Sequence, residues 1–124
     1  MPIVTTIEGR IAQVAIDRPE KRNTLSSELC KDLAREFLEL NDDTRVRSIV
    51  LCGHNNVFCA GLDIEEQLAE NTPIFNEFQK VIDALDALSK PVVAAVSGPA
   101  VSQGAAMLYH CDLVFAGEHA LFSM

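Results

Sequence analysis

The pattern of apolar and polar residues opens with two strands and a helix. Residues 3–7 and 11–16 are rich in β-branched side chains, and Gly9 lies in the turn between them, which predicts a β-hairpin. Beyond a polar loop, Ser26 or Ser27 is placed to cap a helix. The apolar residues of this helix recur at helical spacing: Leu29, Leu33, Phe37 and Leu40.

The middle of the chain alternates buried strands with helices. Residues 48–52 (SIVLC) and 92–96 (VVAAV) are almost wholly apolar, as expected for strands of an interior sheet. Helical patterns occupy 63–70 and 73–88, and Thr72 is expected to cap the second helix with proline at its first position. Together these segments indicate an α/β fold.

The last third of the chain predicts one more helix and one more strand. After the turn at Ser97-Gly98-Pro99, small residues near 102–110 predict a helix that packs close to the sheet, and residues 112–116 predict a strand. No helical pattern follows that strand. We therefore expect a sheet that is left unfinished on its C-terminal side.

The composition limits the classes of protein that the chain can represent. With 124 residues, 48% of them hydrophobic, it is long enough for one globular domain or part of one. Its 18 acidic residues against 10 basic ones give a formal charge of -8, which argues against nucleic acid or an anionic membrane as partner. No apolar run approaches the roughly 20 residues of a membrane span.

The cysteines and histidines indicate neither a disulfide framework nor a metal site. The four cysteines lack CxxC spacing, and no targeting segment opens the chain, so we expect reduced thiols and a cytoplasmic location. The three histidines fall at no metal-ligand spacing relative to the cysteines. We expect no bound metal.

Two segments each deliver the start of a helix from the end of a buried strand. In the first, residues 57–63, Gly61 permits backbone to approach a ligand closely, and N–H groups near Ala60 lack an intrahelical acceptor. Asp63 with Glu66 fits a capping pair. An ordinary strand-to-helix turn explains this segment equally well.

In the second segment, residues 97–104, the N–H groups of Gln103 and Gly104 lie at the positive end of the helix dipole, which favours developing negative charge. Small residues also serve plain helix packing. Two such turns could nevertheless converge on one carbonyl oxygen.

In their order along the chain, these segments resemble the enoyl-CoA hydratase/isomerase (crotonase) family. Any one motif is weak, but together they are in register over nearly the whole chain. The matching segments are 18–25 (RPEKRNTL), 48–53 (SIVLCG), 58–63 (FCAGLD), 90–96 (KPVVAAV), 97–100 (SGPA) and 111–114 (CDLV). The resemblance implies an α/β crotonase-like spiral of ββα units, with residues 1–124 as the N-terminal part of one domain and the C-terminal part absent. It also implies a homo-oligomer, a trimer or a hexamer.

The resemblance implies an oxyanion hole for an acyl-CoA thioester. Backbone N–H groups of Ala60 and Gln103 would polarise the thioester carbonyl and stabilise its enolate. Gln103 stands where the family more often has Gly or Ala, so its side chain must point away or reshape the acyl pocket. CoA enters as part of the substrate, and no tightly bound cofactor is implied. Substrate contacts carried over are Ala60, Gly61, Leu62, Asp63 and Gly104.

Lys21 and Arg22 lie on a loop that runs near the nucleotide in relatives, so either could pair with a CoA phosphate. A solvated charged loop is an equal alternative. Asn23 and Thr24 are interpreted as turn and capping residues only.

The catalytic acid is the missing part of this pattern. A hydratase of the family uses two glutamates, whereas an isomerase can work with one acid. The position of the first glutamate is Ala106 here, and the second would lie beyond Met124. The chain is thus more isomerase-like than hydratase-like, and whether it is an enzyme stays open, since Asp112 and Glu118 are expected to be structural.

Three alternatives compete with this interpretation. The chain could be a non-catalytic or truncated acyl-CoA-binding or assembly protein, which Ala106 favours. Ser102, Asp112 and His119 follow the chain order of an α/β-hydrolase triad, but the acid and the histidine are too close in sequence for that fold. The third alternative, a dinucleotide-binding domain, is weak, because Gly98 and Gly104 match neither the G-x-G-x-x-G spacing nor the P-loop spacing.

Overall fold

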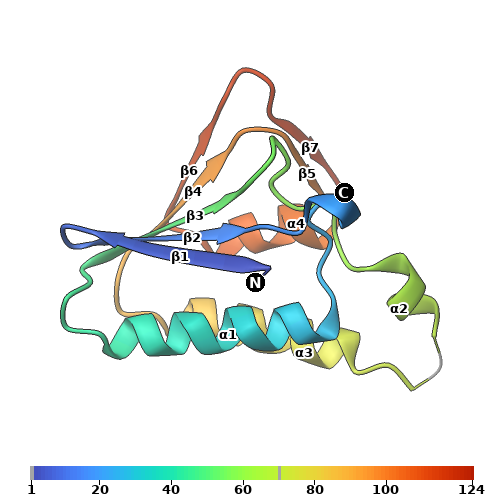
Figure 1. The fold of residues 1–124 in the computed structure, drawn as a ribbon, viewed down its shortest axis with the longest axis horizontal. Coiled ribbons are helices and arrows are strands. Elements are labelled where there is room, and N and C mark those ends of the chain that lie inside the picture. The colour runs from blue at the N-terminus through green and yellow to red at the C-terminus, as the bar shows by residue number, and fades with distance from the viewer. Residues whose placement is uncertain (1, 70) are drawn as a thin grey trace.

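The computed structural model describes residues 2–69 and 71–124 as a layered α/β structure with helices below a twisted sheet (Figure 1). The sheet has five strands in the order β1-β2-β3-β4-β6, of which only the β1–β2 pair is antiparallel. This confirms the predicted hairpin and the predicted α/β class. The strands are β1 (Ile3–Glu8), β2 (Ile11–Ile16), β3 (Ser48–Gly53), β4 (Val92–Val96) and β6 (Leu113–Ala116).

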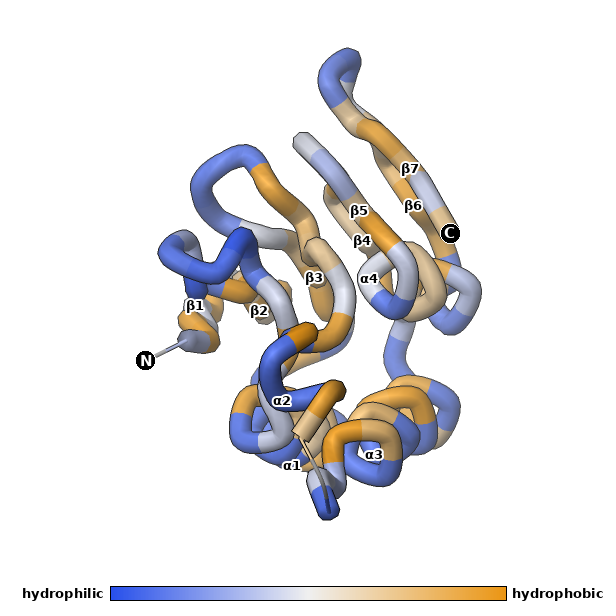
Figure 2. Tube along the Cα trace, turned by 90° about the vertical axis from the view of Figure 1, so that its right-hand side faces the viewer, coloured by the Kyte–Doolittle hydropathy of each residue, from blue (hydrophilic) through white to orange (hydrophobic). Residues whose placement is uncertain are grey.

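Two long helices, α1 (Ser27–Asp42) and α3 (Ile74–Ala87), form the layer on one face of the sheet. The two helices lie side by side below the strands (Figure 2), and most apolar residues of each helix are buried in the core. The predicted apolar stripe of α1 is buried, and Ser26 caps this helix by accepting a hydrogen bond from the Leu29 N–H at 3.1 Å. Burial of this stripe is the main source of stability for the layer.

A second, two-stranded parallel sheet pairs β5 (Pro99–Val101) with β7 (Leu121–Ser123). The sequence pattern did not predict β5, because three residues that begin with proline after a glycine turn carry no strand periodicity. Its pairing partner lies about twenty residues further along the chain. The strand is important for the site because it borders the first of the two turns.

Several helix boundaries differ from the predicted ones. Proline 73 precedes α3 instead of opening it, and the Thr72 Oγ1 accepts a hydrogen bond from the Ile74 N–H at 3.4 Å. Helix α2 (Ile64–Leu68) is shorter than predicted, and position 70 lies outside the described residues. The predicted helix at 102–110 is a single α-helical turn, α4 (Gln103–Ala106), that continues as a 3-10 helix, η2 (Met107–His110).

Strands β6 and β7 expose apolar side chains. Leu113 is 57% exposed, Phe115 64% and Leu121 59%, whereas β4 in the same sheet buries alternate residues. The exposed strands lie at one edge of the molecule (Figure 2). In the described parts of the chain, no helix has the length and apolar character needed to cross a bilayer.

Candidate functional site: two converging turns

Three loops meet where the parallel strands β2, β3 and β4 end. Ligand sites of open α/β sheets characteristically lie at these carboxyl ends. The loop after β3 lies between the other two: it forms an isolated parallel bridge to the loop after β2 (Leu25 with Leu62) and another to β5 (Cys59 with Ala100). The chain is thereby folded so that the two turns singled out in the sequence are neighbours.

Backbone hydrogen bonds hold the first turn on both sides. On one side, the Leu25 N–H donates to the Gly61 carbonyl and the Asp63 N–H donates to the Leu25 carbonyl, each at 2.8 Å. On the other side, the Val101 N–H donates to the Cys59 carbonyl at 2.9 Å. The turn is therefore tied by main-chain hydrogen bonds to both neighbouring segments.

The two predicted donors lie on these turns. Within residues 2–69 and 71–124, neither the Ala60 N–H nor the Gln103 N–H donates a hydrogen bond. Gln103 is the first residue of α4, so its N–H has no intrahelical acceptor. Gly61 brings the turns into contact: it has φ of +101°, and a Cβ on it would lie 3.2 Å from the Val101 carbonyl oxygen.

Gly104 sets the distance between α4 and the first turn. A Cβ at this position would lie 2.2 Å from the carbonyl oxygen of Cys59, so no larger residue fits without moving the backbone. Gly104 is buried. Its contact with the first turn gives it a packing function there, beside the substrate contact that the family resemblance implied.

Asp63 caps α2 and pairs with Arg18. Its Oδ1 accepts hydrogen bonds from the N–H groups of Glu65 and Glu66, and its Oδ2 lies 3.1 Å from the Arg18 Nη2. Burial opposes ionisation of Asp63, but the Glu66 N–H and the Arg18 guanidinium outweigh it and lower the pKa of the carboxyl. The charge of Asp63 is thus already neutralised within the chain.

The predicted capping pair of Asp63 with Glu66 is only half correct. Glu66 does not return to the Asp63 N–H, which donates to Leu25 instead. The Glu66 carboxylate accepts hydrogen bonds from the N–H and hydroxyl of Ser27 and from the Thr72 hydroxyl. It therefore joins α2 to the start of α1 and to the segment before α3.

Lys21 and Arg22 reach the same pocket as Asp63. This cavity of about 230 Å³ lies beside the first turn. The Lys21 Nζ is 3.9 Å from a Glu65 carboxylate oxygen, and its side chain is 43% exposed. A phosphate could pair with these two cations only by competing with that neighbouring carboxylate. The lining residues are Glu20, Lys21, Arg22, Thr24, Asp63, Ile64 and Glu65.

Asn23 positions the first turn, a function that the sequence did not indicate. The residue is fully buried with φ of 58°. Its Nδ2 donates to the carbonyls of His54 (3.0 Å) and Val57 (2.7 Å), while its Oδ1 accepts from the Arg18 N–H at 2.7 Å. It therefore fastens the loop before α1 to the loop after β3. An asparagine in a polar loop gives no sign of burial, so a turn was the natural interpretation.

Cys59 lies under the first turn as a buried, neutral thiol. Burial raises its pKa to about 12, against the weak hydrogen bond from its Sγ to the Gly61 carbonyl at 3.9 Å, which lowers the pKa. All four cysteines are free thiols. Among the described residues, no three His, Cys, Asp or Glu side chains are grouped to hold a metal ion.

The residues of the alternative hydrolase triad do not meet. The Ser102 hydroxyl donates to the Gln103 Oε1 at 2.7 Å, and the Asp112 carboxylate accepts from the Val92 N–H. His119 is 87% exposed beside Glu118. Asp112 therefore joins β6 to β4, as expected for a structural residue, and no relay of the kind needed to activate a serine is present among these three side chains.

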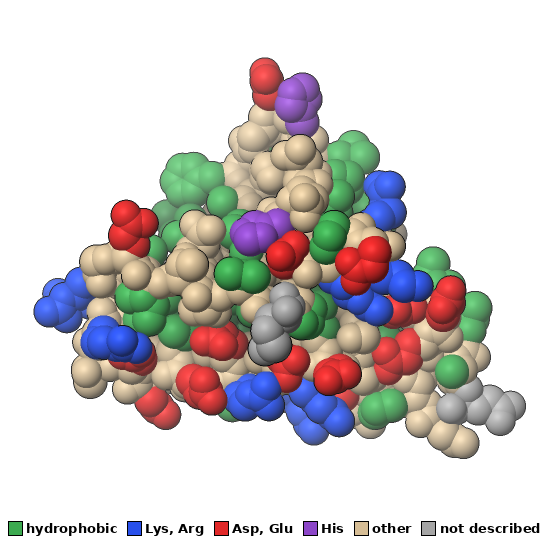
Figure 3. Space-filling view, in the orientation of Figure 1, with side chains coloured by type: hydrophobic (Ala, Val, Ile, Leu, Met, Phe, Trp, Pro, Cys, Tyr) green, Lys and Arg blue, Asp and Glu red, His purple; other side chains and the backbone are tan. Residues whose placement is uncertain are grey.

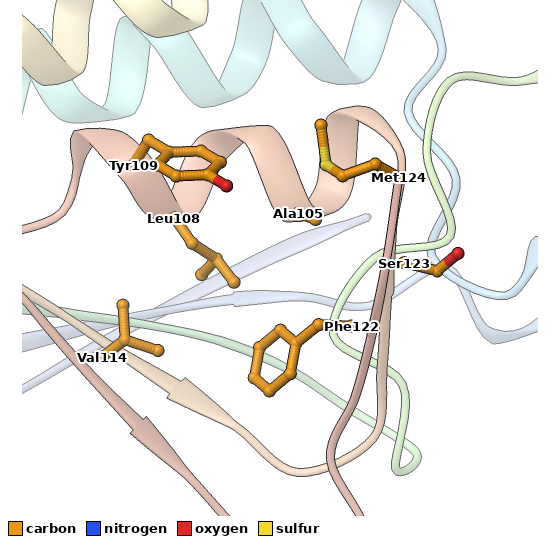
Figure 4. A pocket seen from close by; sticks show the side chains of 7 residues that line it. All are labelled: Ala105, Leu108, Tyr109, Val114, Phe122, Ser123 and Met124. Atoms are coloured by element: carbon orange, nitrogen blue, oxygen red, sulfur yellow. The ribbon is translucent and has the colours of Figure 1, made fainter.

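An apolar pocket of about 370 Å³ borders the second turn (Figure 4). Phe122 and Leu108 point into it from opposite sides, and Ser123, which also lines it, accepts a hydrogen bond from the Ser102 N–H. The charged side chains gather mainly over the helix layer (Figure 3). The lining residues are Ala105, Leu108, Tyr109, Val114, Phe122, Ser123 and Met124.

The fold and the two turns define a crotonase-type α/β protein. The family model for enoyl-CoA hydratase/isomerase matches residues 6–124. The chain therefore belongs to the enoyl-CoA hydratase/isomerase family, as the sequence motifs predicted.

Individual relatives are similar over nearly all of this chain. It is 34% identical to a short-chain-enoyl-CoA hydratase of Clostridium acetobutylicum over 125 residues, covering 97% of this chain and 48% of that protein. It is 35% identical to enoyl-CoA hydratase AKT6-1 of Alternaria alternata over 113 residues, covering 90% of this chain and 38% of that protein. The chain spans about half or less of the length of these relatives.

Solved structures share the fold. PA4980 of Pseudomonas aeruginosa superposes with a TM-score of 0.93 at 34% identity, covering 98% of this chain and 55% of that one. An enoyl-CoA hydratase of Mycobacterium avium subsp. paratuberculosis superposes with a TM-score of 0.89 at 29% identity. This match covers 98% of this chain and 49% of that one. The described residues, 2–69 and 71–124, thus have the fold of about half of a crotonase structure.

Proposed function

We propose that this chain binds an acyl-CoA thioester and stabilises its enolate with the backbone N–H groups of Ala60 and Gln103. The observation that carries the proposal is that two turns distant in sequence are bonded side by side, each with a donor that has no acceptor among the described residues. A thioester oxygen that accepted hydrogen bonds from both N–H groups would be stabilised as it took on the negative charge of the enolate. Single donors of this kind are worth roughly 3–4 kcal/mol in other enzymes.

The surroundings of the turns support the same ligand. The CoA arm would pass the backbone at Gly61 and Leu62, and the pocket with Lys21 and Arg22 continues from there. The apolar pocket beyond the second turn suits an acyl chain. CoA is then part of the substrate.

Ala106 favours an isomerase-like reaction over two-glutamate hydration. A methyl side chain at this position of α4 cannot hold or activate water. A single acid elsewhere in the protein would suffice to move a proton between carbons. Binding without any turnover is the second candidate function, and the same alanine favours it.

Titration of the ¹⁵N-labelled protein with butyryl-CoA tests the proposed donors directly. We expect the Ala60 and Gln103 amide protons to move downfield together, because both would donate to the thioester oxygen. Free CoA is the matched control, since it has the pantetheine arm but no thioester carbonyl, and it should leave the Gln103 main-chain amide in place. Saturation by butyryl-CoA without movement of either amide would exclude this oxyanion hole.

Exchange of the C2 protons of butyryl-CoA in deuterium oxide separates the two candidate functions. A carboxylate that takes a C2 proton to form the enolate, and then returns a deuteron from solvent to C2, exchanges these protons, whereas a binding protein does not. A protein that binds butyryl-CoA but exchanges no C2 proton above the background would be assigned to the non-catalytic class.

A further inference from the structure

Ser102 has a backbone conformation that is unusual for a residue with a side chain. Its φ is 54° and its ψ is -118°, outside the left-handed helical region that Asn and Asp tolerate. Its N–H donates to the Ser123 carbonyl at 2.8 Å, and its hydroxyl donates to the Gln103 Oε1 at 2.7 Å. The strained conformation of Ser102 thus places its hydroxyl where it holds the side-chain amide of Gln103.

This hydrogen bond keeps the Gln103 side chain between the two turns. The Gln103 Oε1 lies 4.0 Å from the position that a Cβ on Gly61 would take, so the amide faces the residue after the first donor. Gln103 is only partly buried. The side chain thus lies beside the first turn, and Gln103 is not among the residues that line the apolar pocket at the second turn.

The other end of the amide is available to a ligand. With Oε1 engaged by Ser102, the Nε2 group carries two N–H donors, and neither donates to any residue in the described part of the chain. When a bound ligand displaces water from these N–H groups, a hydrogen-bond acceptor on the ligand would replace the lost water and stabilise the complex. Glycine or alanine at this position would offer no such donor.

We propose that Gln103 contacts the substrate twice, with its main-chain N–H on the thioester oxygen and its side-chain Nε2 on a second carbonyl oxygen that flanks the thioester. This inference rests on the proposed function. The second carbonyl can come from the pantetheine amide, which every acyl-CoA carries, or from a 3-oxo group on the acyl chain. Ser102 is the positioning residue that holds the amide in place.

Calorimetric titration of the full chain with butyryl-CoA and with 3-oxobutyryl-CoA distinguishes these sources. Gln103→Met retains the length of the side chain and removes the donor. We expect it to weaken binding by about 3- to 10-fold, the value of one hydrogen bond. An equal loss for both ligands assigns the contact to pantetheine, and a loss for 3-oxobutyryl-CoA alone assigns it to the acyl chain.

Ser102→Ala tests the positioning function in the same assay. It should weaken binding in the wild-type background but not in Gln103→Met, because only the amide transmits its effect; a purely structural function would weaken both. Gln103→Ala is a second variant in case Gln103→Met does not fold.

Unchanged affinity of both Gln103 variants for both ligands overturns the inference and leaves the proposed function intact. Failure of the wild-type protein to bind either ligand overturns the proposed function and this inference with it.

Discussion

Asn23 joins the loop before α1 to the turn that carries the first donor. Asn23→Ala would leave the carbonyls of His54 and Val57 and the N–H of Arg18 without their side-chain partner, in a buried place. We expect the free energy of unfolding to fall by about 2–4 kcal/mol, measured by urea denaturation.

Asn56→Ala is the matched control for this change. Asn56 has nearly the same backbone conformation, φ 60°, but is exposed, so its substitution should cost only the left-handed strain of about 1 kcal/mol. Equal losses in the two variants would mean that the buried hydrogen bonds of Asn23 contribute nothing.

The hydrogen bonds of Asn23 are an example of contacts at the candidate site that sequence patterns could not predict. Its partners are the carbonyls of residues 31 and 34 positions away, and main-chain carbonyls have no sequence signature. The Arg18–Asp63 ion pair spans 45 positions and was missed for the same reason. The free N–H groups near Ala60 and Gln103, in contrast, were indicated by a local signal, a strand end followed by a helix start, and the family resemblance then implied these two as the donor pair.

Helix α4 depends on a close approach that only glycine permits. In Gly104→Ala the new methyl group would meet the Cys59 carbonyl, so α4 and the first turn must separate. We expect a loss of stability of about 1–3 kcal/mol or more, measured by thermal or urea unfolding. Binding of butyryl-CoA should weaken as well, because the two donors would no longer meet at one oxygen.

Gly117→Ala controls for the effect of an added methyl group as such. Its Cβ would lie 3.7 Å from the nearest backbone atom, an ordinary contact, so the change should stay within about 0.5 kcal/mol. A Gly104→Ala protein as stable as Gly117→Ala would show that α4 can shift at no cost.

Lys90 caps the C-terminal end of α1 from another element. Its Nζ donates to the carbonyls of Leu40 (2.6 Å) and Asp43 (2.7 Å), where each carbonyl also accepts one longer backbone hydrogen bond, from the N–H of Asp43 (3.2 Å) and of Val46 (3.1 Å). Lys90→Met should reduce the free energy of unfolding by about 1–3 kcal/mol in urea denaturation. Lys31→Met, on an exposed position of α1, should change it by less than about 0.5 kcal/mol.

The elements that sequence predicted well are those that bury a regular stripe. The β1–β2 hairpin, α1 and strands β3 and β4 follow from periodicity that spans two or more turns or pleats. Strand β5 has three residues and owes its existence to pairing with β7, and the change from α4 to η2 falls among small residues that favour neither geometry. Tertiary contacts decide such short pieces.

The whole molecule should lose stability in acid partly through Glu66. Burial opposes its ionisation, but hydrogen bonds from Ser27 and Thr72 lower the pKa of its carboxyl below the ordinary value. The charged form therefore stabilises the fold at neutral pH, and this contribution is lost as pH falls through the lowered pKa.

Paired urea titrations of the wild-type protein and Glu66→Gln isolate this contribution. The wild-type protein should be the more stable at about pH 6, and the difference should shrink as pH falls below about 4. Because the remaining carboxylates are common to both proteins, they cancel in the difference. A difference that is the same at both ends of this range would assign the effect of Glu66 to packing alone.

The reactivity of the buried Cys59 thiol can be used to measure how often the first turn opens. Alkylating reagents attack the thiolate, and a neutral thiol with its pKa raised to about 12 by burial reacts only when the turn opens. Iodoacetamide labelling of Cys59, followed by mass spectrometry, therefore measures how often the site comes apart. A ligand that bridges the two turns should slow this labelling while the half-buried Cys52 and Cys111 react as before. Equal labelling rates with and without bound butyryl-CoA would place the ligand elsewhere.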